Sequence, residues 1–301
     1  MTWLETELAW GITRAWAEEC GAAGRAAASA LAGAFGGAAA LAGRPALHWE
    51  STGSGPPVLL IMGLGLTGGA WWRTVPVLAG DLRVLTFDNR GIGRSRALVQ
   101  AYSTEVMADD AVSVLDAAGV DCAHVYGVSL GGMVAQQVAL RHPGRVRSLV
   151  LGATYAGGPS AHPPSCEVLT FLRRRAFMAH DEAVVDSIPF NYSEDCRAAH
   201  PERIAQDIAQ RLAHTFASEA YWAQLWAAST HDTHQRLHEI AAPTLVVHGT
   251  ADRMIPVQNG RMLAERIPRA RLTEVAGAGH LYGTEAPEVD REISAFMVEH
   301  S

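Results

Sequence analysis

Short apolar runs alternate with stretches of helical periodicity along most of this 301-residue chain. The apolar runs are Val58–Met62, Arg83–Phe87, Ala123–Tyr126, Val146–Leu151, Thr244–Val247 and Arg271–Val275. The helical stretches are Trp71–Ala79, Thr104–Ala118, Gly132–Arg141, Val257–Ile267 and Pro287–His300. Strands that alternate with helices pair in parallel through right-handed crossovers, and runs that are apolar on both faces are typical of a buried sheet. The sequence therefore predicts an α/β fold in which helices flank a mostly parallel sheet.

The alternation stops between Thr154 and Ile240, where helical patterns replace every convincing strand. Helical periods occur there at Cys166–Met178, Glu202–Ala213 and Ser218–Leu237. The simplest interpretation is an inserted helical cap over residues 154–240. The core then comprises residues 46–153 and 241–301.

Residues 1–45 precede this pattern and are rich in alanine. We interpret them as an extra N-terminal helical segment that packs on the core or on a partner, and self-association into a homo-oligomer through this segment is a further expectation. The chain starts acidic, and Glu18, Glu19 and Arg25 interrupt the apolar run. Neither a secretory signal nor an integral membrane span is therefore expected. A cleaved or membrane-bound leader is the alternative interpretation.

The balance of charge narrows the classes of partner. Lysine and arginine number 24 against 31 acidic residues, which gives a formal net charge of -7. Nucleic-acid binders and proteins held on anionic membranes carry strongly basic surfaces. No nucleic-acid partner and no electrostatic membrane anchor is therefore expected.

Cysteine and histidine spacing gives no sign of a metal site. No Cys-x-x-Cys or Cys/His ligand pattern occurs, so neither a metal nor a disulfide framework is expected, and a reduced, cytoplasmic location fits best. The cysteines are Cys20, Cys122, Cys166 and Cys196. Three histidines at helical spacing are interpreted as a solvated or cap-lining helix face rather than a metal site: His231, His234 and His238.

The pentapeptide Gly127-Val128-Ser129-Leu130-Gly131 matches the pattern G-x-S-x-G and stands between an apolar run and a helical stretch. In that strand–turn–helix setting a tight turn lifts the serine hydroxyl above the edge of the sheet. The flanking glycines avoid clashes in the turn, and the helix N-terminus places partial positive charge beneath the serine. We therefore predict that Ser129 is a nucleophile. The alternative is a serine that only caps the helix.

A serine hydroxyl needs a positioned base, and the base needs an orienting acid. His280 lies in a glycine-rich loop just after the last apolar run, from which an imidazole can approach the nucleophile. Asp252 directly follows the run Thr244–Val247 and is placed to accept a hydrogen bond from that imidazole. A solvated loop histidine and a turn aspartate are the alternatives. His248 is assigned instead to a core or sheet-end position.

Attack on a carbonyl creates an oxyanion, which needs donors that are already aimed at it. We expect one donor to be the backbone N–H of Leu130, the residue after the nucleophile. The second is expected from Leu64, in the loop Met62–Leu66 after an early apolar run. Both roles use only the backbone, so the Leu64 side chain is free to face the substrate.

Four motifs in one order resemble the α/β-hydrolase superfamily, over about residues 46–300. They are Met62–Gly65, Asp88–Ser95, Gly127–Gly131, and Gly249–Asp252 with His280. Chain order Ser129, Asp252, His280 is the order of that architecture. Asp88–Ser95 looks like the family's structural turn after a core strand, so no catalytic role is assigned to it. Many members carry a histidine where this chain has Met62.

The stretch from Ser129 to Leu151 looks most like relatives of the 3-oxoadipate enol-lactonases and small-molecule methyl esterases. The resemblance implies an α/β-hydrolase fold with a helical cap. It also implies a carboxylic ester hydrolase (EC 3.1.1) that cleaves an ester, lactone or thioester through an acyl-enzyme, without a cofactor.

Aromatic residues in the cap and after the oxyanion loop suggest a small hydrophobic substrate. The residues expected to contact it are Trp71, Trp72, Tyr155, Trp222 and Trp226. The run Arg173-Arg174-Arg175 is interpreted as a solvated helix face rather than a contact to an acidic group.

Three functions are compatible with these residues. The leading hypothesis is a serine hydrolase acting on a small hydrophobic ester or lactone. The alternative is a natural-product pathway enzyme, a cyclase or lyase, that reuses the scaffold without hydrolysis; Met62 and the N-terminal segment fit such a reuse. A non-catalytic ligand-binding module is the third, and the complete set of serine, histidine and aspartate speaks against it.

Overall fold

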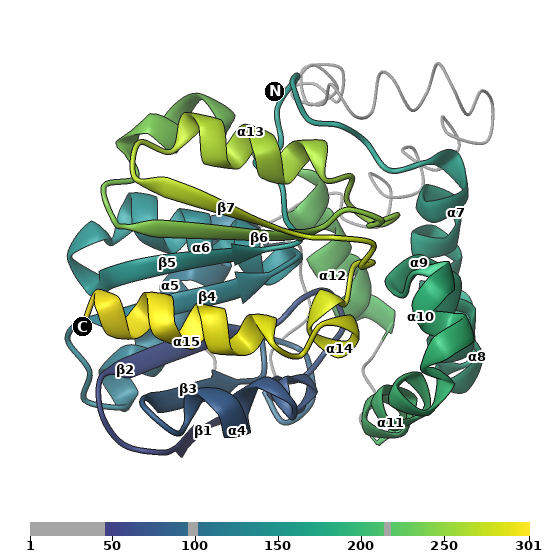
Figure 1. The fold of residues 1–301 in the computed structure, drawn as a ribbon, viewed down its shortest axis with the longest axis horizontal. Coiled ribbons are helices and arrows are strands. Elements are labelled where there is room, and N and C mark those ends of the chain that lie inside the picture. Colours follow the sequence, from purple (N-terminus) through teal and green to yellow (C-terminus); the bar gives the residue numbers. More distant parts are fainter. Residues whose placement is uncertain (1–45, 96–101, 214–217) are drawn as a thin grey trace.

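A computed structural model describes residues 46–95, 102–213 and 218–301, so the helical segment and the homo-oligomer expected at residues 1–45 lie outside the described residues. A seven-stranded sheet in the order β1-β3-β2-β4-β5-β6-β7 forms its centre (Figure 1). The strands are β1 (Trp49–Thr52), β2 (Pro57–Ile61), β3 (Arg83–Phe87), β4 (Ala123–Val128), β5 (Val146–Gly152), β6 (Thr244–Gly249) and β7 (Ala270–Val275). β1 pairs antiparallel with β3, and every other pair is parallel.

The central strands of the sheet are covered on both faces, which explains why they read as continuous apolar runs. In β2, Leu59 and Ile61 belong to one core cluster and Val58 and Leu60 to another, because successive side chains of a strand point to opposite faces. Helices α5 (Thr104–Ala117), α6 (Leu130–Arg141) and α13 (Gln258–Arg266) contribute to the first cluster. Helices α4 (Thr74–Leu78) and α15 (Val289–Glu299) contribute to the second.

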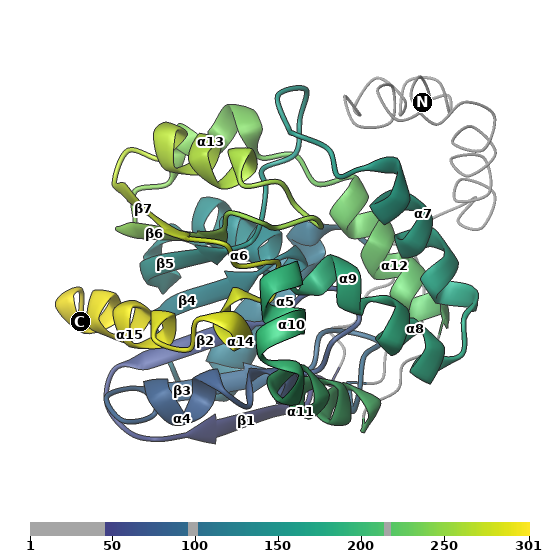
Figure 2. The same cartoon turned by 45° about the vertical axis from the view of Figure 1, so that its right-hand side comes forward.

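The segment between β5 and β6, residues 154–240, is called the cap here. Its described residues contain no strand apart from one isolated bridge between Gly157 and Asp232. Its helices are α7 (Cys166–Arg174), η3 (Arg175–Phe177), α8 (His180–Asp186), α9 (Ile188–Asn191), α10 (Glu194–Ala199), α11 (Pro201–Leu212), α12 (Ser218–Ser229) and η4 (His234–Glu239). Figures 1 and 2 show α7 to α12 on the side toward which the parallel strands point.

The expected helix Ser218–Leu237 is wrong in its extent, because α12 ends at Ser229 and η4 begins at His234. His231 therefore lies between two helices, where its Nδ1 is 3.0 Å from the Thr104 hydroxyl, and burial lowers its pKa to about 3. The three spaced histidines do not form one helix face.

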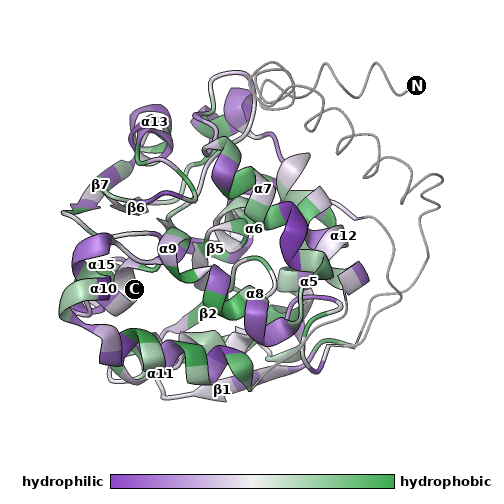
Figure 3. Cartoon of the chain, turned by 90° about the vertical axis from the view of Figure 1, so that its right-hand side faces the viewer, coloured by the Kyte–Doolittle hydropathy of each residue, from purple (hydrophilic) through white to green (hydrophobic). Residues whose placement is uncertain are grey.

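Local capping chemistry explains the short helices of the cap. Ser165 accepts a hydrogen bond from Val168 N at the start of α7, and Ser193 does the same for Cys196 N at the start of α10. Pro201 opens α11, where its missing N–H costs nothing. Hydrophilic and hydrophobic residues alternate along α11 (Figure 3), and its Ile204 packs with buried cap residues. None of the helices in the described ranges is long and apolar enough to span a membrane.

The short elements that remain are η1 (Gly68–Trp71), η2 (Pro143–Arg145) and α14 (Tyr282–Glu285). The first and last of these follow loops that lead away from the carboxyl ends of β2 and β7. Because parallel strands end at one edge of the sheet, the loops after β2, β4, β6 and β7 meet beneath the cap. The residues expected to be functional lie in those loops.

Candidate active site

Ser129 occupies a strained turn between β4 and α6. Its backbone has φ 58° and ψ -122°, a conformation that a residue with a side chain rarely adopts and that costs about 1–3 kcal/mol. The turn is held by a hydrogen bond of 2.9 Å from Ser129 N to Gly152 O. A second, of 2.7 Å, runs from the Thr154 hydroxyl to Ser129 O. The strain is therefore imposed by neighbouring strands rather than by the turn alone.

The two glycines of the pentapeptide have a steric cause. A Cβ on Gly127 would fall on the carbonyl oxygen of Gly131, and a Cβ on Gly131 would fall on the carbonyl oxygen of Ile61. Backbone atoms of a central strand and a helix cannot give way, so only glycine fits at both positions.

Asp252 lies in the loop after β6 and is almost completely enclosed. Its Oδ1 accepts hydrogen bonds from Met254 N at 2.8 Å and Ile255 N at 2.9 Å. Its Oδ2 accepts one of 2.8 Å from His280 Nδ1. Burial alone would raise the pKa of Asp252, but the imidazoles of His280 and His248 keep it below its usual value. The carboxylate is thus held charged and in a fixed orientation.

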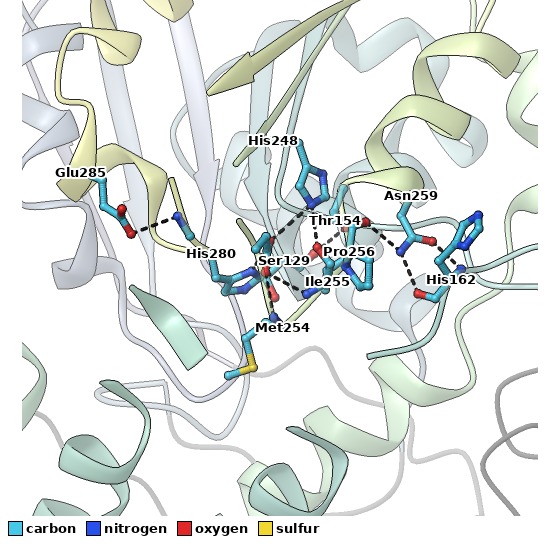
Figure 4. Close-up of polar contacts among 12 residues, drawn as sticks. Ser129, Thr154, His162, His248, Met254, Ile255, Pro256, Asn259, His280 and Glu285 are labelled. Atoms are coloured by element: carbon cyan, nitrogen blue, oxygen red, sulfur yellow. Dashed lines mark hydrogen bonds and ion pairs between the residues drawn. The ribbon is translucent and has the colours of Figure 1, made fainter. Parts of the chain in front are cut away.

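His280 stands between Asp252 and the serine. Because a carboxylate only accepts hydrogen bonds, Nδ1 of His280 carries the proton that it donates to Asp252, and Nε2 is left as an acceptor. Ser129 and His280 line the same cavity and lie beside each other in Figure 4. In the described part of the chain no hydrogen bond joins the two side chains. Such contacts are often loose before a substrate binds.

The loop that carries His280 is tied to the cap by Glu285, which the sequence analysis did not single out. Its carboxylate accepts a hydrogen bond of 3.0 Å from Gly279 N, and Figure 4 shows Glu285 with such a contact. It also accepts hydrogen bonds from Ser193 N at 2.9 Å and from the Ser193 hydroxyl at 2.5 Å. Leu281 N also donates to Asn191 O at 3.0 Å. Residues on both sides of His280 are therefore pinned to the cap. No local sequence pattern signals this contact.

His248, assigned from the sequence to a core or sheet-end position, is fully buried at the end of β6 and also contacts the acid. Its Nε2 donates to Ile255 O at 2.8 Å and lies 3.3 Å from Asp252 Oδ2. The spacing of four residues between His248 and Asp252 gave the only hint of this contact. The aspartate is thus flanked by two imidazoles.

The loop after β2 carries the second expected donor of an oxyanion hole. The N–H groups of Leu64 and Leu130 make no hydrogen bond within the part of the chain that the structure describes, and both residues line the cavity at Ser129. The loop is fixed from two sides, since Asn89 Nδ2 donates to Met62 O and Gly65 N donates to the cap residue Gln224. Two backbone N–H groups of the cavity wall are thus without a partner in the described residues.

The turn Asp88–Ser95 directly follows the core strand β3, as the resemblance implied. Asp88 accepts hydrogen bonds from Gly68 N at 2.8 Å and Arg94 N at 2.9 Å, which close the turn on the loop after β2. Asp88 is not among the residues that line the cavity at Ser129.

The cavity at Ser129 measures about 160 Å³ and is lined mainly by apolar side chains. Of the expected substrate contacts, Tyr155 lines it. Trp71 and Trp72 line a second, smaller cavity of about 80 Å³ that also reaches His280. The two cavities share Met62, Leu66, Val128, Arg211, His280 and Leu281.

The two remaining expected contacts line neither cavity. Trp222 packs its ring 5.5 Å from that of Phe177, and Trp226 is likewise outside the cavity. From α12 the cavity is lined by Leu225, Ala228 and Ser229 instead. The phase of the helix decides which side chains face inward, and the residue type alone cannot give that phase.

The interpretation of the arginine run as a solvated face is wrong at one of its three positions. Arg174 is exposed, whereas Arg175 begins η3, is 7% exposed and lines the cavity. The change from α-helix to 3-10 helix at this point turns Arg175 inward.

A buried parallel sheet, a strained serine between a strand and a helix, and an Asp–His pair on later loops together define the α/β-hydrolase class. The family model for the alpha/beta hydrolase fold matches residues 56–183 and 190–287. The chain belongs to the α/β-hydrolase family, and we conclude that it is a hydrolase of this type.

Relatives and solved structures agree with this assignment. A protein of Azorhizobium caulinodans named carbamate hydrolase RutD is 33% identical over 249 residues, which cover 82% of this chain and 92% of the relative. Its namesake from Variovorax paradoxus is 35% identical over 85% of this chain and 97% of its own length. An esterase from Thermogutta terrifontis is 30% identical with a TM-score of 0.73, over 85% and 94% of the two chains. The enol-lactonase of Burkholderia xenovorans is 25% identical with a TM-score of 0.74, over 84% and 96%.

Proposed function

We propose that this protein hydrolyses a carboxylic ester, lactone or thioester through an acyl-enzyme formed on Ser129. The observation that carries the proposal is the arrangement of three groups: Ser129 and His280 share one cavity wall, and His280 Nδ1 donates to the buried carboxylate of Asp252. This leaves the second ring nitrogen of His280 free to accept the serine proton.

The reaction follows from these positions. Ser129 Oγ attacks the substrate carbonyl carbon while its proton passes to His280 Nε2, and the carbonyl oxygen becomes an oxyanion. The N–H groups of Leu64 and Leu130 donate hydrogen bonds to that oxyanion. The bond to the leaving group breaks as His280 returns the proton to it. A water molecule then attacks the acyl carbon, gives its proton to His280, and releases the acid while Ser129 regains its proton. Asp252 stabilises the imidazolium in both halves.

The size and lining of the cavity support a substrate larger than a few atoms. A volume of about 160 Å³ holds on the order of ten water-sized positions. Its walls include Leu64, Leu169, Leu172 and Leu225, which favour a hydrocarbon body. The relatives named above are hydrolases, which favours hydrolysis over the cyclase or lyase alternative.

The experiment is labelling with a fluorophosphonate probe, followed by a panel of short-chain and long-chain nitrophenyl esters and lactones. We expect the probe to label Ser129, and Ser129→Ala to lose both labelling and about 10⁴-fold or more of kcat. Ser51→Ala, on the exposed edge strand β1, is the matched control and should behave as the wild type. Labelling or turnover that persists in Ser129→Ala would refute the proposal.

Carbamate hydrolysis is a second candidate, because the RutD relatives cover most of the chain. It predicts release of ammonia from carbamate faster than the spontaneous reaction, and that excess should disappear in Ser129→Ala. Carbamate has four heavy atoms and would leave most of the cavity unfilled, so the ester or lactone function is the leading one.

A further inference from the structure

Two buried arginines of the cap reach the cavity at Ser129. Arg175 stands at the start of η3 and Arg211 in the last turn of α11. Each side chain lines the cavity although its residue is only 7% exposed. Apolar side chains make up most of the remaining wall. A buried cation such as Arg211 is costly in such a wall unless a negative group enters, since moving a charge out of water costs several kcal/mol.

Arg211 has hydrogen-bonding capacity that the protein does not use. Its Nη2 donates to the Ser187 hydroxyl at 2.8 Å. Its Nε and Nη1 are buried, and neither has a partner within hydrogen-bond distance among the described residues. The Tyr192 hydroxyl is near enough to favour the charged guanidinium, but it already donates to Asp207. Among those residues, no carboxylate lies within ion-pair distance of the Arg211 guanidinium. A guanidinium buried in this way is a site for an acceptor that comes from outside.

The nearest acidic residue on the same helix, Asp207, forms its hydrogen bonds with other residues. Asp207, one turn before Arg211, accepts from Arg73 Nε at 3.0 Å, from the Tyr192 hydroxyl at 3.1 Å and from the Thr284 hydroxyl at 2.5 Å. It contributes a favourable field at Arg211 but no direct contact. Asp207 therefore offsets the charge of Arg211 only at a distance, without forming an ion pair with it.

Arg175 adds a second positive charge to the same cavity. Its guanidinium lies 5.1 Å from the centre of the Tyr221 ring, a cation–π contact that holds it in place. Burial, and next the repulsion from Arg175, lowers the pKa of Arg211. A negatively charged group beside Arg211 would offset both effects.

Given the proposed function, we propose that the substrate carries a carboxylate at the end away from the reacting carbonyl, and that Arg211, supported by Arg175, binds it. The arginines belong to the cap, whereas Ser129 and His280 belong to the core, so one molecule spans the cavity between them. The substrate class is then a half-ester of a dicarboxylic acid or a lactone with a carboxylate side chain. Its body is apolar and one end is charged.

The test compares two esters of equal chain length, the mono-4-nitrophenyl ester of glutarate and 4-nitrophenyl pentanoate. Reactions run at low ionic strength, and the rate with Ser129→Ala is subtracted as background. We expect wild-type kcat/KM to favour the glutarate ester by about 10- to 100-fold, the range for hydrogen bonds to a charged group. Arg211→Gln should reduce that preference at least tenfold, and Arg211→Lys, which keeps the charge, should lie between.

Arg174→Gln is the matched control, because it removes an exposed arginine next to Arg175 and should leave the preference unchanged. A wild-type preference below twofold, or the same preference in Arg211→Gln, would overturn the carboxylate proposal while esterase activity stands. If neither ester is cleaved and the fluorophosphonate does not react, the proposed function fails. Calorimetry of glutarate with Ser129→Ala then decides the carboxylate site, which requires binding that Arg211→Gln weakens at least tenfold.

Discussion

Asp290, near the start of α15, makes the stability of this protein depend on pH in an unusual direction. The residue is 2% exposed, its Oδ2 accepts a hydrogen bond of 2.9 Å from the Thr74 hydroxyl, and its Oδ1 has no partner in the described residues. Burial raises the pKa of Asp290 to about 6 from the usual 3.8, an effect that the Thr74 hydrogen bond only partly offsets. The folded protein therefore binds this proton more tightly than the unfolded chain does.

The direction and size of the change in unfolding free energy with pH follow from the linkage between proton binding at Asp290 and folding. Between about pH 4 and pH 6 the folded state holds the proton and the unfolded state loses it, so the free energy of unfolding falls as the pH rises. Above pH 6 the folded protein carries the full energetic cost of burying the charged Asp290 carboxylate. A difference of about two pKa units corresponds to about 3 kcal/mol. Asp290→Asn keeps the shape and removes the charge, so it should stabilise the protein by up to about 3 kcal/mol at pH 8 and by little at pH 4.

The measurement is urea unfolding of the wild type and Asp290→Asn at several pH values between 4 and 8. Asp121→Asn, in an exposed turn before β4, serves as the control and should leave the pH dependence of the wild type intact. A stability difference between wild type and Asp290→Asn that stays constant over this pH range would refute the argument.

Three further perturbations test the site and its supports. His248→Ala should lower esterase kcat/KM about tenfold through loss of a contact to Asp252, with KM nearly unchanged; a change in KM alone would contradict this. Glu285→Gln should lower the free energy of unfolding in urea by about 2 kcal/mol, since two N–H groups and a hydroxyl lose a charged acceptor; an unchanged midpoint would count against the tie. Gly131→Ala should abolish fluorophosphonate labelling or folding, whereas Gly144→Ala, which meets open space, should do neither.

The strands of the core were readable from the sequence because burial on both faces demands continuous apolar runs. Six of the seven observed strands coincide with the predicted runs, although the edge strand β7 has no fully buried residue. The seventh, β1 (Trp49–Thr52), was missed because it is an edge strand whose last three residues are exposed, so no apolar run marks it. The short cap helices α8, α9 and α10 were missed for a related reason, since four to seven residues are too few to show a helical period.

The candidate site was predictable where strand ends fix it and unpredictable where distant elements meet. Ser129 and Asp252 follow strands directly, so the topology alone brings them to one edge of the sheet. The contact of Glu285 joins the cap to a loop 92 residues further along the chain, and the contact of Arg211 joins two different helical segments of the cap. Their positions depend on how short helices pack, and the sequence carries no local sign of that packing.

The hydrogen bonds of Glu285 have a consequence for how the enzyme admits its ligand. One carboxylate accepts hydrogen bonds from both Ser193, which caps α10, and the peptide N–H before His280. Moving α10 away from the core would therefore break contacts that hold the His280 loop. Residues 191–193 thus behave as an anchor that travels with the catalytic loop. An opening of the cap that preserves these hydrogen bonds would have to take place at α7, α8 or the chain around them, because α10 is tied to the core.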